Sequence, residues 1–200
     1  MRRLLWAFAL AVLCFVPASA QVIEFESNGL KYQTLTRSGV TVMWAQLPMQ
    51  LHEYHVIQVA VSNGSGGPYV IRPEDFSFVL ADGRTLRGSA AAGVVNMFYR
   101  KGSSNDVVKL VTAYEASVYG MPNFKSTNGY EQRRQGALAA MQSSKVKAAA
   151  TASALALVQT KLTPGDSTDG AVFFPSDGKP LGPGYLVVRT NTDVFHFGTN

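Results

Sequence analysis

The stretch His55-Val56-Ile57-Gln58-Val59-Ala60-Val61 decides the fold class, because it is rich in β-branched residues and has the length of one strand. A second run, Val40-Thr41-Val42-Met43-Trp44, has the same character. Turn signals separate such runs at Asn28-Gly29, Ser38-Gly39 and Asp82-Gly83. Residues 21–90 are therefore predicted to form short antiparallel strands of a sandwich or barrel.

The C-terminal part of the chain returns to the same pattern. Gly170-Ala171-Val172-Phe173-Phe174 and Tyr185-Leu186-Val187-Val188-Arg189 read as strands. Neither strand-rich block has enough strands to close a core alone, and a half-apolar sheet needs a second sheet to bury one face. We therefore expect one domain over residues 21–200, in which strands from about 21–90 and 158–200 pair with each other. The aromatic residues of these runs are expected in the core. They are Trp44, Tyr54, Phe76, Phe78, Phe173 and Phe174.

Between the two blocks the apolar period changes from two to that of a helix. The stripe Val107, Leu110, Val111, Tyr114 and Val118 predicts a helix over about 105–119, capped by Ser104 or Asn105. An alanine-rich helix is predicted from Tyr130 to about Ala156, with a break near Ser143-Ser144 as an alternative. Because this helix has few large apolar residues, it either approaches a partner surface closely or stays partly exposed.

The order of these motifs resembles the immunoglobulin-like sandwiches of bacterial exported proteins, such as the DUF4352 and telokin-like families. The motifs are His55–Val61 with Ser62-Asn63, Phe76–Leu80 with Asp82-Gly83, and Leu162-Thr163-Pro164-Gly165-Asp166-Ser167 running on to Phe174. The resemblance covers about 55–95 and 160–200. It implies a binding or accessory role in the cell envelope and supplies no catalytic residues.

The resulting fold class is mainly β with an α insertion. It is an immunoglobulin-like antiparallel β-sandwich interrupted by a helical segment at about 91–157, where the sequence departs from the family pattern.

The first twenty residues have the pattern of a secretory signal peptide. Arg2 and Arg3 precede an uncharged apolar run over residues 4–16, and Pro17-Ala18-Ser19-Ala20 follows, so we expect cleavage between Ala20 and Gln21. The run is shorter than the roughly 20 residues of a spanning helix. A helix of the folded domain is one alternative to this interpretation.

The single cysteine bears on the same segment. Cys14 lies within the predicted signal peptide, so the mature chain would have no disulfide and no thiol nucleophile. Lipid attachment at Cys14 is a second alternative, but Leu13 stands where lipoprotein signals carry a small residue. The prediction is a protein exported to the periplasm or the extracellular space, with no transmembrane span.

Charge is unevenly distributed along the chain. The whole chain carries +5, and loss of Arg2 and Arg3 leaves +3. Residues 100–161 hold nine basic and three acidic side chains, a local charge of +6 within an otherwise acidic body. The candidate partner-binding residues are Arg133, Arg134, Lys145 and Lys147. The expected partner is an envelope protein or an anionic surface, not a nucleic acid. Solvated helix faces are the alternative.

Residues with catalytic or metal-binding chemistry are sparse. His52 and His55 are three apart, which would place them on opposite faces of a strand, and no third ligand is nearby. No metal and no cofactor are therefore expected. The sequence favours a non-enzymatic binding module with the helical insertion as its interaction surface. The alternative is a hydrolase or metal-dependent enzyme whose site assembles from dispersed residues such as His52, His55 and Asp193. A third interpretation makes the insertion a lid over one sheet.

Overall fold

The structure is a computed structural model that describes residues 21–121, 124, 127, 129–139, 143–177 and 180–198. The predicted signal peptide lies outside the described residues. Strands account for 42% and helices for 29%, so the protein is mainly β with helices, as the sequence predicted. The larger sheet has the order β1-β2-β3-β4-β9. Its strands are β1 (Ile23–Ser27), β2 (Leu30–Arg37), β3 (Val40–Leu51), β4 (Tyr54–Asn63) and β9 (Ser167–Pro175).

A smaller sheet and a two-stranded ribbon complete the β structure. The smaller sheet has the order β11-β10-β6-β7 and the ribbon pairs β5 with β8. These strands are β5 (Tyr69–Ile71), β6 (Phe76–Leu80), β7 (Thr85–Arg87), β8 (Thr160–Leu162), β10 (Gly184–Arg189) and β11 (Val194–His196). A short 3-10 turn, η2 (Pro73–Asp75), precedes β6.

Strands far apart in the sequence pair side by side. Antiparallel ladders join β4 to β9, β6 to β10 and β5 to β8. Each ladder links the N-terminal block to the C-terminal block, as we expected from the number of strands in each. The hairpins within the first block turn at Asn28-Gly29 and Ser38-Gly39, where all four residues have the positive φ typical of tight two-residue turns.

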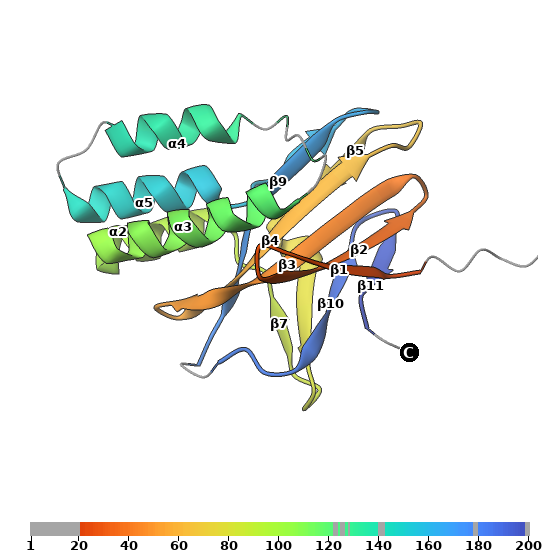
Figure 1. Cartoon of the computed structure of the whole chain (residues 1–200), viewed down its shortest axis with the longest axis horizontal. Coiled ribbons are helices and arrows are strands. Elements are labelled where there is room, and N and C mark those ends of the chain that lie inside the picture. Colours follow the sequence, from red (N-terminus) through yellow and green to blue (C-terminus); the bar gives the residue numbers. More distant parts are fainter. Residues whose placement is uncertain are drawn as a thin grey trace, which may run out of the picture.

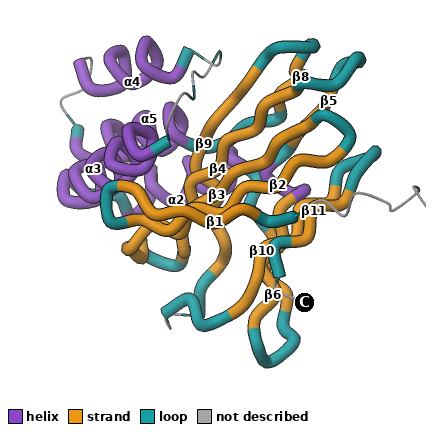
Figure 2. The backbone as a smooth tube through the Cα atoms, turned by 45° about the vertical axis from the view of Figure 1, so that its right-hand side comes forward, coloured by secondary structure: helices purple, strands orange, loops and turns teal. Residues whose placement is uncertain are grey.

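The helices form a third layer on the outer face of the larger sheet (Figures 1 and 2). They are α2 (Ala91–Lys101), α3 (Ser104–Gly120), α4 (Tyr130–Ala139) and α5 (Ser144–Leu155). Helix α5 contacts each of the other three, and α3 contacts β3 and β4 directly. Figure 1 shows α4 as the outermost helix, lying over α5. The order of layers is helices, larger sheet, smaller sheet.

The larger sheet is buried on both faces in its centre. On the helix side, Tyr32, Leu47, Val56 and Phe173 belong to one core. On the other side, a second core faces the smaller sheet; its members include Val42, Trp44, Val59, Val172 and Phe174. Strands covered on both faces are apolar throughout and do not alternate, which explains the run His55–Val61. The aromatic residues predicted for the core lie in these two clusters, with Tyr54 half-buried.

Of the two expectations for the alanine-rich helix, α5 shows close approach to its neighbours, while Ser144, Lys145 and Ser153 are exposed. Ala148, Ala149, Ala152 and Leu155 are each at most 6% exposed and belong to the helix-side core. Small side chains allow α5 to pack closely against α2 and α3 while it covers the sheet. The segment thus forms a layer of the fold, in line with the interpretation of a lid.

Three helix boundaries differ from the prediction. Residues 91–101 form α2, which the sequence analysis did not identify as a helix. The single helix over 130–156 is wrong, because α4 ends at Ala139 and α5 starts at Ser144, which confirms the alternative break. The cap of α3 is Ser103, one residue before the expected positions, and its side chain accepts from the Asp106 N–H.

Candidate functional site

The four predicted partner-binding residues are divided between helices α4 and α5. Arg133 is exposed on α4, and Lys145 is exposed in the first turn of α5 with the half-buried Lys147 beside it. The side chain of Arg134 lies outside the described residues. Figure 1 shows that α4 and α5 run in opposite directions. A role of these residues in partner binding stays a prediction.

Other cations join these lysines at one end of the layer. A Cβ atom at Gly102 would lie 2.6 Å from the Ala148 Cβ, so the end of α2 packs against the start of α5. The two adjoining helix ends carry Arg100, Lys101, Lys145 and Lys147, which we call the basic end. Lys101 Nζ is 3.1 Å from Glu53 Oε2. The first turn of α5 has no acidic residue and no side-chain cap, so its two lysines stand at the positive end of the helix dipole.

The predicted strand position of His52 is wrong. It lies in the turn between β3 and β4, with a positive φ of 51°, and only His55 is in a strand. The turn brings His52 Nε2 within 3.0 Å of Asp106 Oδ2 and its ring edge-on to Phe98. Burial would raise the pKa of Asp106, but hydrogen bonds from Ser103 and His52 outweigh it and hold that pKa below its usual value. The contacts of His52 with Asp106 and Phe98 therefore connect the β3–β4 hairpin to the helical layer.

The dispersed trio proposed for an enzyme does not assemble. Asp193 accepts a hydrogen bond of 2.7 Å from Ser38 Oγ, next to the start of β3. His52 follows the other end of the same strand, which has 12 residues and so spans about 40 Å. His55 lies in β4, in the wall of the cleft described next. Within the described part of the chain, no three His, Cys, Asp or Glu side chains group as metal ligands would.

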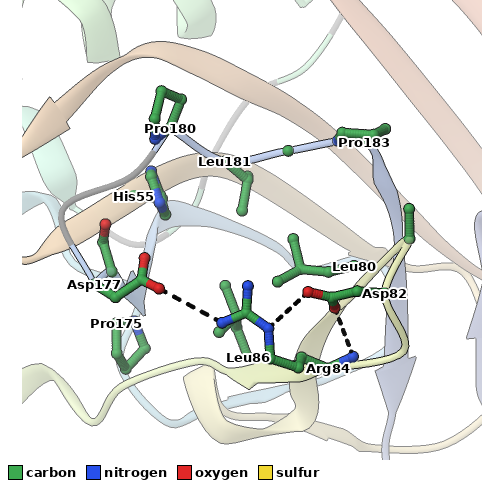
Figure 3. A pocket seen from close by; sticks show the side chains of 13 residues that line it. His55, Leu80, Asp82, Arg84, Leu86, Pro175, Asp177, Pro180, Leu181 and Pro183 are labelled. Carbon is green, nitrogen blue, oxygen red and sulfur yellow. Dashed lines mark hydrogen bonds and ion pairs between the residues drawn. The ribbon is translucent and has the colours of Figure 1, made fainter.

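A cleft of about 490 Å³ lies where β9, the β6–β7 hairpin and the segment before β10 meet (Figure 3). Its apolar lining includes Leu80, Leu86 and Leu181, and prolines stand at its edge. Arg84 lies across it, with Nε 2.8 Å from Asp82 Oδ2 and Nη1 3.6 Å from Asp177 Oδ2. The hydrogen bonds from Arg84 lower the pKa of Asp82. Since Arg84 is already engaged by two carboxylates, the cleft offers little free positive charge.

A second concavity, which we call the edge groove, lies beside β1 at the border of the larger sheet. It measures about 370 Å³. Its side-chain lining includes Glu24, Glu26, Lys31, Gln33, Trp44 and Gln46, and Gly184 of β10 closes one side. Trp44 Nε1 and Gln33 Oε1 are buried and have no hydrogen-bond partner among the described residues. The sequence predicts Trp44 in the core and indicates no role for Gln33. The regular pairing of β1, β2 and β3 is the signal that could have placed these side chains on one face.

No protein-family model and no curated protein matches this chain. Among solved structures, it is similar to the yjhA protein from Bacillus subtilis, with 10% identity and a TM-score of 0.33. The similarity covers 85% of this chain and 83% of that chain. So weak a similarity supports no inference about function, which has to be argued from the sites themselves. In the described part of the chain, no helix has both the length and the apolar character needed to cross a bilayer.

Proposed function

We propose that this protein is an exported, non-enzymatic binding module that docks an acidic partner on the basic end of its helical layer. The observation that carries the proposal is that the C-terminal end of α2, which bears Arg100, adjoins the N-terminal end of α5, which bears Lys145 and Lys147. Glu53 pairs with Lys101 of the basic end, which leaves Arg100, Lys145 and Lys147 as its contribution to binding, and the nearby Asp106 is engaged by His52 and Ser103. An envelope protein with an acidic face, or an anionic surface, fits this charge.

The placement of the two lysines supports a binding role. Cations in the first turn of a helix oppose its dipole, at a cost of a few tenths of a kcal/mol each. No acidic residue in the first turn of α5 offsets this cost. Residues that conflict with local stability are typical of functional surfaces. We retain the periplasm or the extracellular space as the compartment, and the immunoglobulin-like sandwich as the type of β core, as parts of the same proposal.

Charge reversal tests the proposal. Arg100→Glu, Lys145→Glu and Lys147→Glu together should reduce binding to anionic phosphatidylglycerol vesicles and to envelope extract at least tenfold. Binding by the unchanged protein should also weaken with salt, since the Debye length falls from about 10 Å at 0.1 M to about 3 Å at 1 M.

The matched control reverses three exposed cations outside the basic end, Arg87, Lys161 and Arg189. It changes the net charge by the same amount and should leave binding intact. An equal loss of binding in both triple variants would mean that only the overall charge matters. Unchanged binding after charge reversal at the basic end would mean that the basic end is only a solvated surface.

A further inference from the structure

The edge groove has a polar lining on a face that is apolar elsewhere. On the side that faces the smaller sheet, the larger sheet carries Leu35, Val42 and Val61 where it is covered. Beyond that cover the same face is polar. Glu24 pairs with Gln33 and Gln33 with Trp44, and Glu26 pairs with Lys31 in the next row. These side chains therefore form two adjacent rows over β1, β2 and β3.

The orphaned groups in the groove are complementary in type. Trp44 is 9% exposed, and its indole N–H can only donate. Gln33 Oε1 is a carbonyl oxygen and can only accept, and the hydrogen bond from Nε2 of the same amide to Glu24 fixes which end of the amide is the oxygen. Buried polar groups without a partner are rare and costly, so two on directly paired residues need an explanation. A hydroxyl group both donates and accepts, so it matches both types of orphaned atom.

The remaining lining suits a ligand with many hydroxyls. Glu26, Lys31 and Gln46 are exposed, and they offer a carboxylate, an ammonium and an amide group to a ligand in the groove. Two carboxylates against one ammonium leave the lining with a net negative charge, which disfavours anionic ligands. A volume of about 370 Å³ lies at the lower end of the range for small-molecule sites.

We propose that the edge groove binds a neutral or aminated saccharide unit, with Trp44 Nε1 and Gln33 Oε1 sharing one sugar hydroxyl. The proposal does not depend on the basic end, which lies on the helical layer, across the larger sheet from the groove. Glu24 orients the Gln33 amide so that its oxygen is left for the ligand.

The indole N–H signal of Trp44 in an NMR spectrum is the direct readout. The chain has two tryptophans, and Trp44→Phe identifies the signal by removing it. We expect cellohexaose, chitohexaose or its deacetylated form to shift this signal saturably, with an affinity that salt does not weaken for the neutral sugars. Polygalacturonate, an anionic saccharide, should not shift it.

Gln33→Met removes the acceptor and should weaken saccharide affinity about fivefold or more, the effect of one hydrogen bond. Gln58→Met is the matched control. Gln58 also has a buried, unpartnered Oε1, but it lies on the helix side of the sheet, outside the groove. This control should leave the affinity unchanged.

Three results would overturn the proposal. One is that no member of the saccharide panel shifts the Trp44 signal. Another is equal affinity in Gln33→Met and the unchanged protein. The third is that a short alternating Thr-Val peptide shifts the signal and the saccharides do not, which would assign the groove to strand addition along β1. Charge reversal at the basic end should not alter saccharide binding, so the two proposals can fail separately.

Discussion

Tyr32 shows how one side chain docks a helix on the sheet. It is fully buried, and its hydroxyl donates to the Ser117 carbonyl of α3 over 2.7 Å. Burial raises the pKa of its phenol to about 12. The un-ionised phenol therefore contributes stability that is fully present below the unfolded pKa of about 10 and is lost as the pH rises towards 12.

We predict that Tyr32→Phe lowers the free energy of unfolding by about 1 kcal/mol at neutral pH, the worth of one hydrogen bond. The difference from the unchanged protein should shrink as the pH rises above about 10. Urea titrations at neutral pH and near pH 11 measure both effects, with the exposed Tyr99→Phe as control. A difference that stays constant over this range would mean that the phenol contributes no pH dependence.

Asp106 serves the helix start and the hairpin turn together. Its carboxylate accepts from the Ser103 N–H at 2.8 Å and lies 3.0 Å from His52 Nε2. Because its folded pKa is lowered, the charged form contributes stability above the unfolded pKa of about 3.9, and this is lost as the pH falls through the folded value.

Asp106→Asn should therefore cost about 1–2 kcal/mol of unfolding free energy at neutral pH and much less near pH 2. Urea unfolding at the two pH values tests this. Glu74→Gln, an exposed acid in η2, should stay within about 0.5 kcal/mol of the unchanged protein. An equal cost for Asp106→Asn at both pH values would rule out a role for the charge.

At the scale of elements, the joint between α2 and α5 depends on the absence of a side chain at Gly102. Its φ of −65° suits any residue, so the reason for glycine is space. Ala at this position would place Cβ 2.6 Å from the Ala148 Cβ. We predict that Gly102→Ala destabilises the fold by about 1–3 kcal/mol, the usual cost of overpacking.

Gly136→Ala is the counterpart in α4. Nothing lies within 4 Å of a Cβ atom there, so the change should stabilise the protein by up to about 1 kcal/mol through helix propensity. Thermal or urea unfolding of both variants gives the comparison. Similar effects of the two changes would show that Gly102 is not held by close packing.

Strands were easier to predict than helices for a physical reason. β-branched runs and turn dipeptides that end in glycine act locally, so β3, β4 and the turns at Asn28-Gly29 and Ser38-Gly39 could be expected from short windows, whereas the β3–β4 turn at His52-Glu53 has no glycine and was missed. Helix α2 also had a local signal, because its buried residues Val94, Met97 and Phe98 have helical spacing. The edge groove had none. The surroundings of Trp44 depend on Phe78 and Phe197, residues distant in the sequence that pack against its ring.

For the whole molecule, the two-sided burial of the larger sheet makes the helices indispensable. Replacing residues 91–157 with a short linker would expose Leu47, Val56 and Phe173, among others, as one apolar patch. We predict that this variant does not unfold cooperatively in urea and that it binds a hydrophobic dye. A variant with a sharp urea transition and no dye binding would show that the β layers stand alone. Charge reversal, not deletion, is therefore the way to test the helical surface.

The pairing of β4 with β9 also determines when the chain can fold. Tyr54 pairs with Pro175, which lies 121 residues later in the chain. A ribosome or a translocation channel releases the N-terminal end first, so β4 emerges long before its neighbour. Until β9 emerges, one edge of β4 has no neighbouring strand, and the apolar face that the helices later cover is exposed to solvent. Long-range closure of this kind is slow. The emerging chain therefore stays loosely folded until nearly its whole length has been delivered, and in that state it can still pass through a narrow channel.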